Sequence, residues 1–316
     1  MKIERGVALI TALLVVVLAS IAATAMLSSA NLAVHRSATL SDTERAWWYV
    51  DGAEIWVKAI LLADYRKDPA TDYLGEPWAH QLDYLPVDEG AMRGGVIDLQ
   101  GRFNLNNLGG SPGDPNDQQW VKYKDQFERL LQNIDGLQNQ NTAGLADAIR
   151  DWIDADVQPH GSVGAEDDAY SGLPLPYRTA NQPMASISEL LAVRGVTKEI
   201  YLALRNYICV LPQGTPINVN TAPLPVLLSL TAQPSPTLAQ FVETRDKKPA
   251  DSAQTFGAQY SIGQTILVPI DVKSQYFQLR AEAVIGSSHV ALYSVIYRPA
   301  QTNGVPAVIS RSQDFE

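Results

Sequence analysis

Residues 1–34, "MKIERGVALITALLVVVLASIAATAMLSSANLAV", decide how the rest of this chain is interpreted. Lys2 and Arg5 precede Gly6, and no charged residue then follows until Arg36. An uncharged stretch of this length can cross a hydrocarbon layer of about 30 Å as a helix. Because the basic residues lie before the stretch and none lies directly after it, we expect a cytoplasmic N-terminus and a body on the outside.

The apolar stretch admits three interpretations. A secretory signal peptide would be removed at small residues such as "ATAMLSSA" at 23–30, whereas a plain signal anchor would stay. The third is a retained helix that continues into the body. Residues 31–68 contain no proline and a single glycine. Leu40, Val50 and Ile55 suit one side of a helix, which favours one continuous helix from the membrane into the body.

A family resemblance rests on these residues. The short basic leader that ends in glycine, the segment "VALITALLVVVLAS" at 7–20 and the long helix after it resemble the class III signal of type IV pilins and type II secretion pseudopilins. The resemblance implies that prepilin peptidase cuts between Gly6 and Val7 on the cytoplasmic side of the inner membrane. It also implies that Val7 becomes an N-methylated first residue and that the apolar helix stays on the protein.

The fifth residue after the implied cut departs from the common pattern. Most family members carry glutamate there, and this chain carries Thr11. The role usually assigned to that glutamate is to pair with the terminal amine of the subunit ahead, because an unpaired carboxylate in an apolar fibre is unfavourable. A subunit at the tip has no such partner. In this respect, and in its large body, the chain resembles the minor pseudopilin K family of type II secretion systems (GspK).

The body predicts an α+β fold. The segment "GGVIDLQGRFNLNNL" at 94–108 suggests two short strands around a turn at Gln100-Gly101, and part of it resembles a hairpin of the K pseudopilins. Three more strands are expected within residues 276–313, where apolar residues alternate. The region between them has mostly helical periodicity. We therefore expect a pilin-like long N-terminal α-helix packed on a small antiparallel β-sheet, with a large, mostly α-helical inserted domain.

The expected organisation has five segments. They are the prepilin leader at 1–6, the transmembrane and assembly helix at 7–30, the first part of the pilin-like domain at 31–105, the inserted helical domain at 106–265 and the C-terminal strands of the pilin-like domain at 266–316.

Composition limits the partners and the chemistry. The net charge of −10 argues against nucleic acid, because a phosphate backbone is bound by dense lysine and arginine. The single cysteine, Cys209, excludes an internal disulfide. The motifs G-x-S-x-G and H-E-x-x-H and a phosphate-binding loop do not occur in the chain. We therefore expect a protein without enzymatic activity.

An acidic loop is the one stretch that suggests a cofactor. The segment "RDWIDADVQPHGSVGAEDDAY" at 150–170 brings six carboxylates together. After Arg150 at its start, His160 is the one residue in it that can carry a positive charge. Oxygen ligands in an irregular loop suit calcium. An EF-hand that starts at Asp154 fails, because its sixth position is Pro159 instead of glycine and its twelfth is Ala165. From the spacing alone, a calcium loop and a solvated acidic loop are equally good interpretations.

The resemblance decides for calcium. K pseudopilins are known for calcium in their helical domain, beside a similar "W-x-D-x-D … G-A-E-D" pattern, and this implies one or two Ca²⁺ ions here. The candidate ligands are Asp154, Asp156, Glu166 and Asp167, with Asp168 as the next choice. Asp151 is expected only to end its helix.

Two classes of function remain at this stage. The first is a non-enzymatic minor pseudopilin at the tip of the type II secretion pseudopilus, which helps start its assembly with the I, J and H minor pseudopilins. Secreted cargo and the outer-membrane secretin are further candidate contacts. The second is a membrane-anchored periplasmic hydrolase that uses the acidic loop as a catalytic metal site. A type IV pilus minor pilin is a rival to the first class, although such proteins are normally smaller and often carry a disulfide.

The processing site is directly testable. Mass spectrometry of the mature protein should show an N-methylated chain that starts at Val7. A chain that starts after Ala30, or one that retains Met1, would contradict the implied cleavage.

Overall fold

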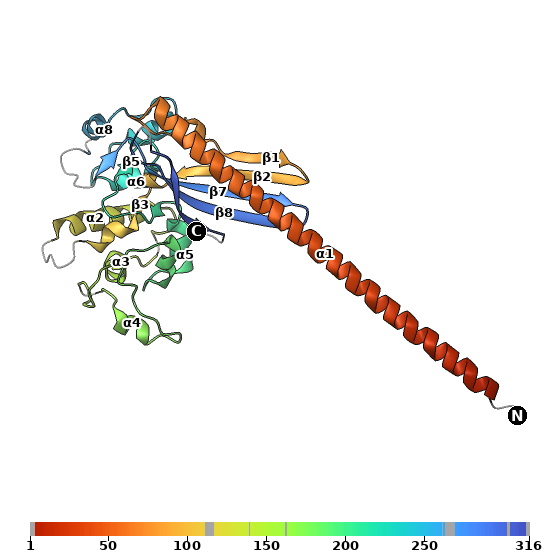
Figure 1. Ribbon diagram of the computed structural model, residues 1–316. Helices are drawn as coiled ribbons and strands as arrows, with labels where there is room; N and C mark the ends of the chain where they lie inside the picture. The colour runs from red at the N-terminus through yellow and green to blue at the C-terminus, as the bar shows by residue number, and fades with distance from the viewer. Residues whose placement is uncertain are drawn as a thin grey trace. The chain divides into compact units, whose positions relative to one another are not determined.

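The computed structural model describes residues 4–110, 117–138, 140–161, 163–260, 262, 269–301 and 304–313, with side chains from Val7 onwards (Figure 1). Its α-helices are α1 Glu4–Lys67, α2 Gln118–Gln132, α3 Leu145–Ile153, α4 Asp167–Ser171, α5 Lys198–Leu204, α6 Leu224–Ser229, α7 Leu238–Thr244 and α8 Ala253–Gln259. Its 3-10 helices are η1 Pro77–Ala79, η2 Leu99–Gly101, η3 Leu105–Gly109 and η4 Ile187–Ala192. Its strands are β1 Leu82–Val87, β2 Gly90–Asp98, β3 Phe103–Asn104, β4 Ile208–Cys209, β5 Ile217–Asn218, β6 Ile270–Asp271, β7 Tyr276–Ile285, β8 Ser288–Tyr297 and β9 Ala307–Ser312.

Helix α1 confirms the continuous N-terminal helix. It runs for 64 residues without a break, and at 1.5 Å per residue it is about 96 Å long. In the described part of the chain, the span Val7–Lys67 is the one helix with the length and composition to cross a membrane. Its side chains from Val7 to residue 41 are all exposed in the isolated chain. The first three residues of the predicted leader lie outside the described residues.

The buried side of α1 differs in part from the predicted one. Val50 is buried as expected, and Val57 and Leu61 join it at helical spacing. Leu40 and Ile55, which the sequence placed on the same side as Val50, are 66% and 65% exposed.

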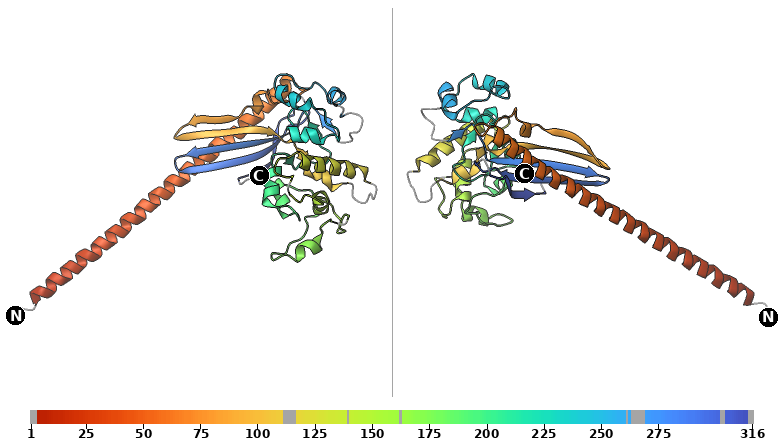
Figure 2. Two further views of the ribbon diagram at one scale, coloured as in Figure 1. Left: turned by 180° about the vertical axis from the view of Figure 1, so that it is seen from behind. Right: turned by 45° about the horizontal axis from the view of Figure 1, so that its top comes forward.

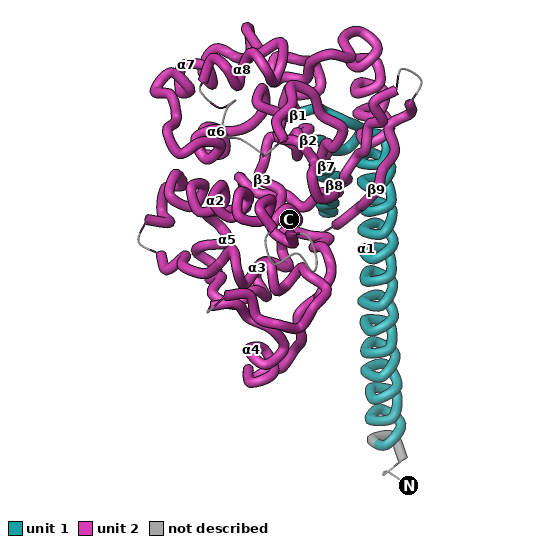
Figure 3. Tube along the Cα trace, turned by 90° about the vertical axis from the view of Figure 1, so that its left-hand side faces the viewer, with its two compact units in different colours: residues 1–52, 83–93, 282–291 teal, residues 53–82, 94–281, 292–316 magenta. Residues whose placement is uncertain are grey.

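Two compact units make up the chain, and α1, β1, β2, β7 and β8 contribute residues to both (Figure 3). The smaller unit comprises 1–52, 83–93 and 282–291. Within it, the Ser288 hydroxyl lies 2.9 Å from the Thr43 hydroxyl and donates to the Thr39 carbonyl at 3.2 Å. Gly286 has a φ of +52°, and a Cβ there would lie 2.4 Å from Asp42 Oδ2, so both backbone and space require glycine at this turn.

A five-stranded antiparallel sheet has the order β1-β2-β7-β8-β9. The β1–β2 and β7–β8 hairpins lie side by side in it (Figure 2). The three predicted C-terminal strands are confirmed as β7, β8 and β9. β9 pairs antiparallel with β8, with a register shift between Val295 and Ile296. The sheet leaves β9 as one edge strand.

The two strands and the turn predicted for 94–108 are confirmed as the end of β2, η2 and β3, but their pairing as a hairpin is wrong. Strand β2 continues to Asp98, the chain then turns through η2, and β3 pairs parallel with β4, with Phe103 opposite Ile208. The Asp98 carboxylate accepts from the Gln100 backbone N–H at 2.8 Å, which starts the helical turn. Asn104 accepts from the Asn106 N–H at 3.1 Å in the same way. Such local side-chain bonds compete with strand pairing and divert the chain from a hairpin.

The larger unit, comprising 53–82, 94–281 and 292–316, contains the helical region. The expectation that this region is mostly helical is confirmed by α2 to α8. The Asp117 carboxylate caps α2 by accepting from the Gln119 and Trp120 N–H groups at 3.0 and 2.9 Å. Tyr123, Phe127 and Leu130 then recur on its buried side, and α2 packs against α6 while α3 packs on η3. The main apolar core lies among these helices.

A buried arginine binds three segments of the larger unit together. Arg298 is 2% exposed and donates to Asp72 Oδ2 at 2.6 Å, to Asp64 Oδ2 at 3.4 Å and to the Ser274 carbonyl at 2.9 Å. Its guanidinium also lies over the Phe277 ring, 4.8 Å from the centroid. The arginine therefore joins the end of α1, the loop after it and the segment between β6 and β7.

Loss of this arginine should be severe, because removing one partner of a buried ion pair leaves the other charge unpaired. We expect Arg298→Leu to lower the free energy of unfolding by about 3–5 kcal/mol, measured by urea unfolding of the full chain in detergent. Arg45→Leu is the control, because the Arg45–Glu89 pair has side chains that are 49% and 64% exposed. It should change stability by less than about 1 kcal/mol. Equal effects of the two substitutions would contradict the role given to Arg298.

Candidate metal centre

The acidic loop brings three of the predicted ligands together. Asp154 follows directly after α3, and Glu166 precedes α4. Asp154, Asp156 and Glu166 each offer a carboxylate oxygen within 4.8 Å of the others. Asp154 and Glu166 are only 7% and 4% exposed, whereas Asp156 is open to solvent. Two of the three carboxylates are therefore removed from water beside a third negative charge.

The protein does little to neutralise this group. Burial, followed by the neighbouring Asp156 and Asp151 carboxylates, raises the pKa of Asp154 to about 6. Burial raises the pKa of Glu166 to about 7. Arg150 offers partial compensation, with its Nε 3.5 Å from Asp154 Oδ2. The group is unfavourable at neutral pH unless a proton or another cation enters it.

His160, which the sequence offered as a cation within the loop, does not fill that role. Its Nε2 lies 3.1 Å from the Trp120 indole N–H, which makes it a hydrogen-bond acceptor. Burial, followed by the charge of Arg150, lowers the pKa of His160 below its ordinary value. The imidazole is therefore neutral at pH 7 and adds no positive charge to that of Arg150.

The donor atoms fit a hard divalent cation. Asp154 Oδ1 and Glu166 Oε1 are buried and accept no hydrogen bond from the described residues. A buried carboxylate oxygen without a partner is unfavourable, and a cation that bound both oxygens would remove this penalty. Oxygen-only ligands on an irregular loop match Ca²⁺ better than Mg²⁺, which demands a near-octahedral shell. Asp154, Asp156 and Glu166 are the residues that would hold it.

The other two predicted ligands lie outside this group of three. Asp167 Oδ1 accepts from the Thr179 backbone N–H and hydroxyl at 3.1 and 3.0 Å, and Arg178 Nε lies 3.7 Å from its Oδ2. Asp168 is exposed in the first turn of α4. The sequence interpretation also missed Thr179, whose hydroxyl donates to Glu166 Oε2 at 3.2 Å. No local pattern connects Thr179 to the loop.

A second group of carboxylates, Asp64, Asp72 and Glu76, was not predicted. Its oxygens also lie within 4.8 Å of one another, and all three residues are buried. Here, however, Arg298 binds Asp72 and Asp64, and Glu76 Oε2 accepts from the Trp78 indole N–H at 2.7 Å. Burial still raises the pKa of Glu76 to about 7. Arg298 therefore supplies a cation to Asp72 and Asp64, whereas Glu76 is held by hydrogen bonds from the Trp78 indole and the Tyr73 backbone N–H.

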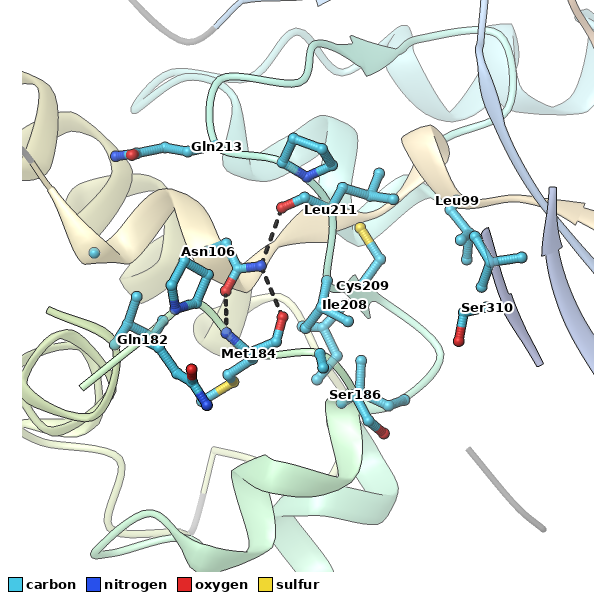
Figure 4. A pocket seen from close by; sticks show the side chains of 18 of the residues that line it. Leu99, Asn106, Gln182, Met184, Ser186, Ile208, Cys209, Leu211, Gln213 and Ser310 are labelled. Carbon is cyan, nitrogen blue, oxygen red and sulfur yellow. Dashed lines mark hydrogen bonds between the residues drawn. The ribbon is translucent and has the colours of Figure 1, made fainter. Parts of the chain in front are cut away.

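Figure 4 shows a cavity of the larger unit. Its volume is about 850 Å³, and Asp154 and Ala155 of the acidic loop are among the residues that line it. Asn106 holds two loops that line it, because its amide accepts from the Met184 N–H at 2.8 Å and donates to the Met184 and Leu211 carbonyls at 3.0 Å. Strand β9 and the buried Cys209 form other parts of the wall. Asp154 is the one carboxylate among the described lining residues, so the cavity and the candidate metal centre share one side chain.

The predicted assembly residue lies on α1. Thr11 is exposed, and its hydroxyl donates to the Val7 and Ala8 carbonyls at 3.1 and 3.0 Å. Gly6 and Val7, which flank the predicted cleavage site, belong to the same helix. The threonine therefore satisfies its polar group within its own helix.

The continuous helix, the antiparallel sheet and the helical region between its strands define a pilin-like α+β protein. A family model described as "Type II secretion system (T2SS), protein K" matches residues 101–213. The chain is also 36% identical to type II secretion system protein K of Aeromonas hydrophila, over 93% of each chain. The chain belongs to the type II secretion system protein K family, the minor pseudopilins called GspK.

Further similarities agree with this assignment. The protein K of Pseudomonas aeruginosa is 34% identical, over 93% of this chain and 89% of the relative. The fold matches a chain in the crystal structure of the GspK-GspI-GspJ complex from the type 2 secretion system of enterotoxigenic Escherichia coli. The TM-score is 0.76 at 24% identity, and the match covers 89% of this chain and all of the other.

Proposed function

We propose that this chain is the minor pseudopilin at the tip of the type II secretion pseudopilus, where it helps start assembly for protein export across the outer membrane. Thr11 is the observation that carries the proposal. Its hydroxyl is bonded to carbonyls of its own helix, so it needs no terminal amine from a subunit ahead. A tip subunit has no subunit ahead of it. Membership of the protein K family favours type II secretion over a type IV pilus.

The proposed partners follow from the fold and from a relative. The matching crystal structure contains GspI and GspJ beside GspK, and we infer that the I and J minor pseudopilins bind this chain too. The exposed apolar part of α1 supports a single-pass anchor in the inner membrane. The basic leader favours a cytoplasmic N-terminus and a periplasmic body. Prepilin peptidase and the H-type pseudopilin are further proposed partners, by family resemblance. The role needs no enzymatic activity.

Calcium is the proposed cofactor. The support is the pair of buried, unpartnered oxygens on Asp154 and Glu166 and the absence of a sufficient counter-charge among the described residues around them. When bound, the ion would supply positive charge and would tie the end of α3 to the start of α4. It would act on the stability of the helical region and take no part in a reaction.

The tip position is testable through Thr11. In cells that lack the native protein, Thr11→Val should support secretion as well as the wild type, because valine also needs no partner in an apolar environment. Gly6→Val is the control, because it should block cleavage and abolish secretion. Secreted protein in the medium and copurified I- and J-type pseudopilins are the measurements. Loss of assembly by a Thr11→Val chain that inserts normally would refute the tip position.

Calcium binding should raise the stability of the fold, because the unfolded chain cannot hold these oxygens together. The stabilisation is RT ln(1 + [L]/Kd), or about 2.7 kcal/mol at a hundredfold excess over Kd. The full chain in detergent should melt at a lower temperature in chelator, and calcium should restore its stability better than magnesium. Asp154→Ala combined with Glu166→Ala should remove this dependence.

The control for this experiment removes two exposed carboxylates from α2, by Asp125→Ala combined with Glu128→Ala. This variant should keep the calcium response. If the acidic loop is only solvated, chelator will have no effect on the wild type, and the Asp154 and Glu166 double variant will be neutral or mildly more stable.

A further inference from the structure

Asp151 makes contacts that the end of a helix does not require. It lies within α3, one turn before Asp154, and its side chain is completely buried. Its Oδ1 accepts from the His160 backbone N–H at 3.0 Å, and its Oδ2 accepts from the Ala165 backbone N–H at 2.6 Å. One carboxylate therefore binds two backbone groups of the loop that connects α3 to α4.

Gly164 shows how closely the loop approaches this carboxylate. A Cβ at Gly164 would lie 2.2 Å from Asp151 Oδ2 and 2.5 Å from the His160 carbonyl oxygen. The Gly164 N–H itself donates to that carbonyl at 3.2 Å. Any side chain at this position would push the loop away from Asp151, so the contact requires glycine.

The two ends of the candidate metal centre are positioned by different means. Asp154 is held by the helix, because its backbone N–H donates to the Arg150 carbonyl at 2.8 Å. Glu166 is the N-cap residue of α4, where its carbonyl accepts from the Ala169 N–H at 2.7 Å and its Oε2 accepts from the Thr179 hydroxyl at 3.2 Å. The bond from Asp151 to the Ala165 N–H holds the residue directly before Glu166. Of these contacts, the bond to Asp151 is the one that ties the chain at Glu166 back to α3, the helix that carries Asp154 at its end.

We propose that Asp151 is a positioning residue that closes the loop and places Glu166 beside Asp154 and Asp156 before a cation binds. The inference rests on the proposed calcium site. A site that is already assembled binds its ion without the added loss of loop entropy. When the contact is broken, calcium binding has to order the loop as well, and affinity falls.

Two substitutions break the same contact in different ways. Asp151→Asn keeps the shape but turns an N–H₂ group toward a backbone N–H. Gly164→Ala keeps every charge and every acceptor but fills the space that the loop needs. Asp147→Asn is the charge-matched control: Asp147 is also on α3, but it binds Lys124 and accepts no hydrogen bond from the described backbone of the loop.

The experiment measures calcium affinity of the full chain in detergent by calorimetry, well below the melting temperature. Asp151→Asn and Gly164→Ala should each weaken calcium binding at least tenfold, and the double variant should lose little more. Asp147→Asn should change affinity less than threefold. In chelator, hydrogen exchange at the His160 and Ala165 amides should speed up in the first two variants only.

The experiment distinguishes failure of the proposed metal centre from failure of the role proposed for Asp151. If the wild type releases no heat with calcium, the metal centre is refuted, and the positioning role of Asp151 is refuted with it. If the wild type binds calcium and both loop variants bind it within twofold, only the role of Asp151 is refuted, even if both variants melt earlier. If Asp151→Asn does not fold, Gly164→Ala decides the question by the same two measurements.

Discussion

Carboxylates that are removed from water have to be neutralised, and the stability of the larger unit depends on how the protein neutralises them. Near the end of α1, the Arg298 guanidinium neutralises Asp72 and Asp64 through ion pairs and hydrogen bonds. At Asp154 and Glu166 the surrounding residues supply too little positive charge, and two buried oxygens accept no hydrogen bond from the described residues. The same physical constraint thus accounts for the buried ion pairs of Arg298 at one place and for the proposed calcium site at the other.

Features that depend on local chemistry were readable from the sequence. The absence of proline in residues 31–68 was enough to predict an unbroken helix, and alternating apolar residues were enough to predict β7 and β8. The two strands and the turn at 94–108 could also be predicted, but the pairing of β3 with β4 in place of β2 could not. Besides their local bonds, the Asp98 and Asn104 side chains accept hydrogen bonds from the distant Thr221 hydroxyl and Leu211 N–H, and sequence spacing contains no sign of such contacts.

The candidate metal centre could also be predicted from the sequence only in part. Asp154, Asp156 and Glu166 could be identified because they lie close together in sequence within one acidic loop. The second function of Asp151, as an acceptor for two loop amides, could not be read, because it depends on how the loop folds back onto α3. The buried Asp64 and Asp72 group was invisible because its cation, Arg298, lies more than two hundred residues further along the chain.

The sheet order also determines when the fold can be completed. Strand β2 ends at Asp98, but its neighbour β7 does not begin until Tyr276. The ribosome delivers the helical segments between them first, and these contain most of the apolar core residues. The helical region can therefore begin to collapse while the β1–β2 hairpin still has an open edge, and the last strands made close that edge. A chain that stops short of β7 would keep this edge unpaired and open to aggregation.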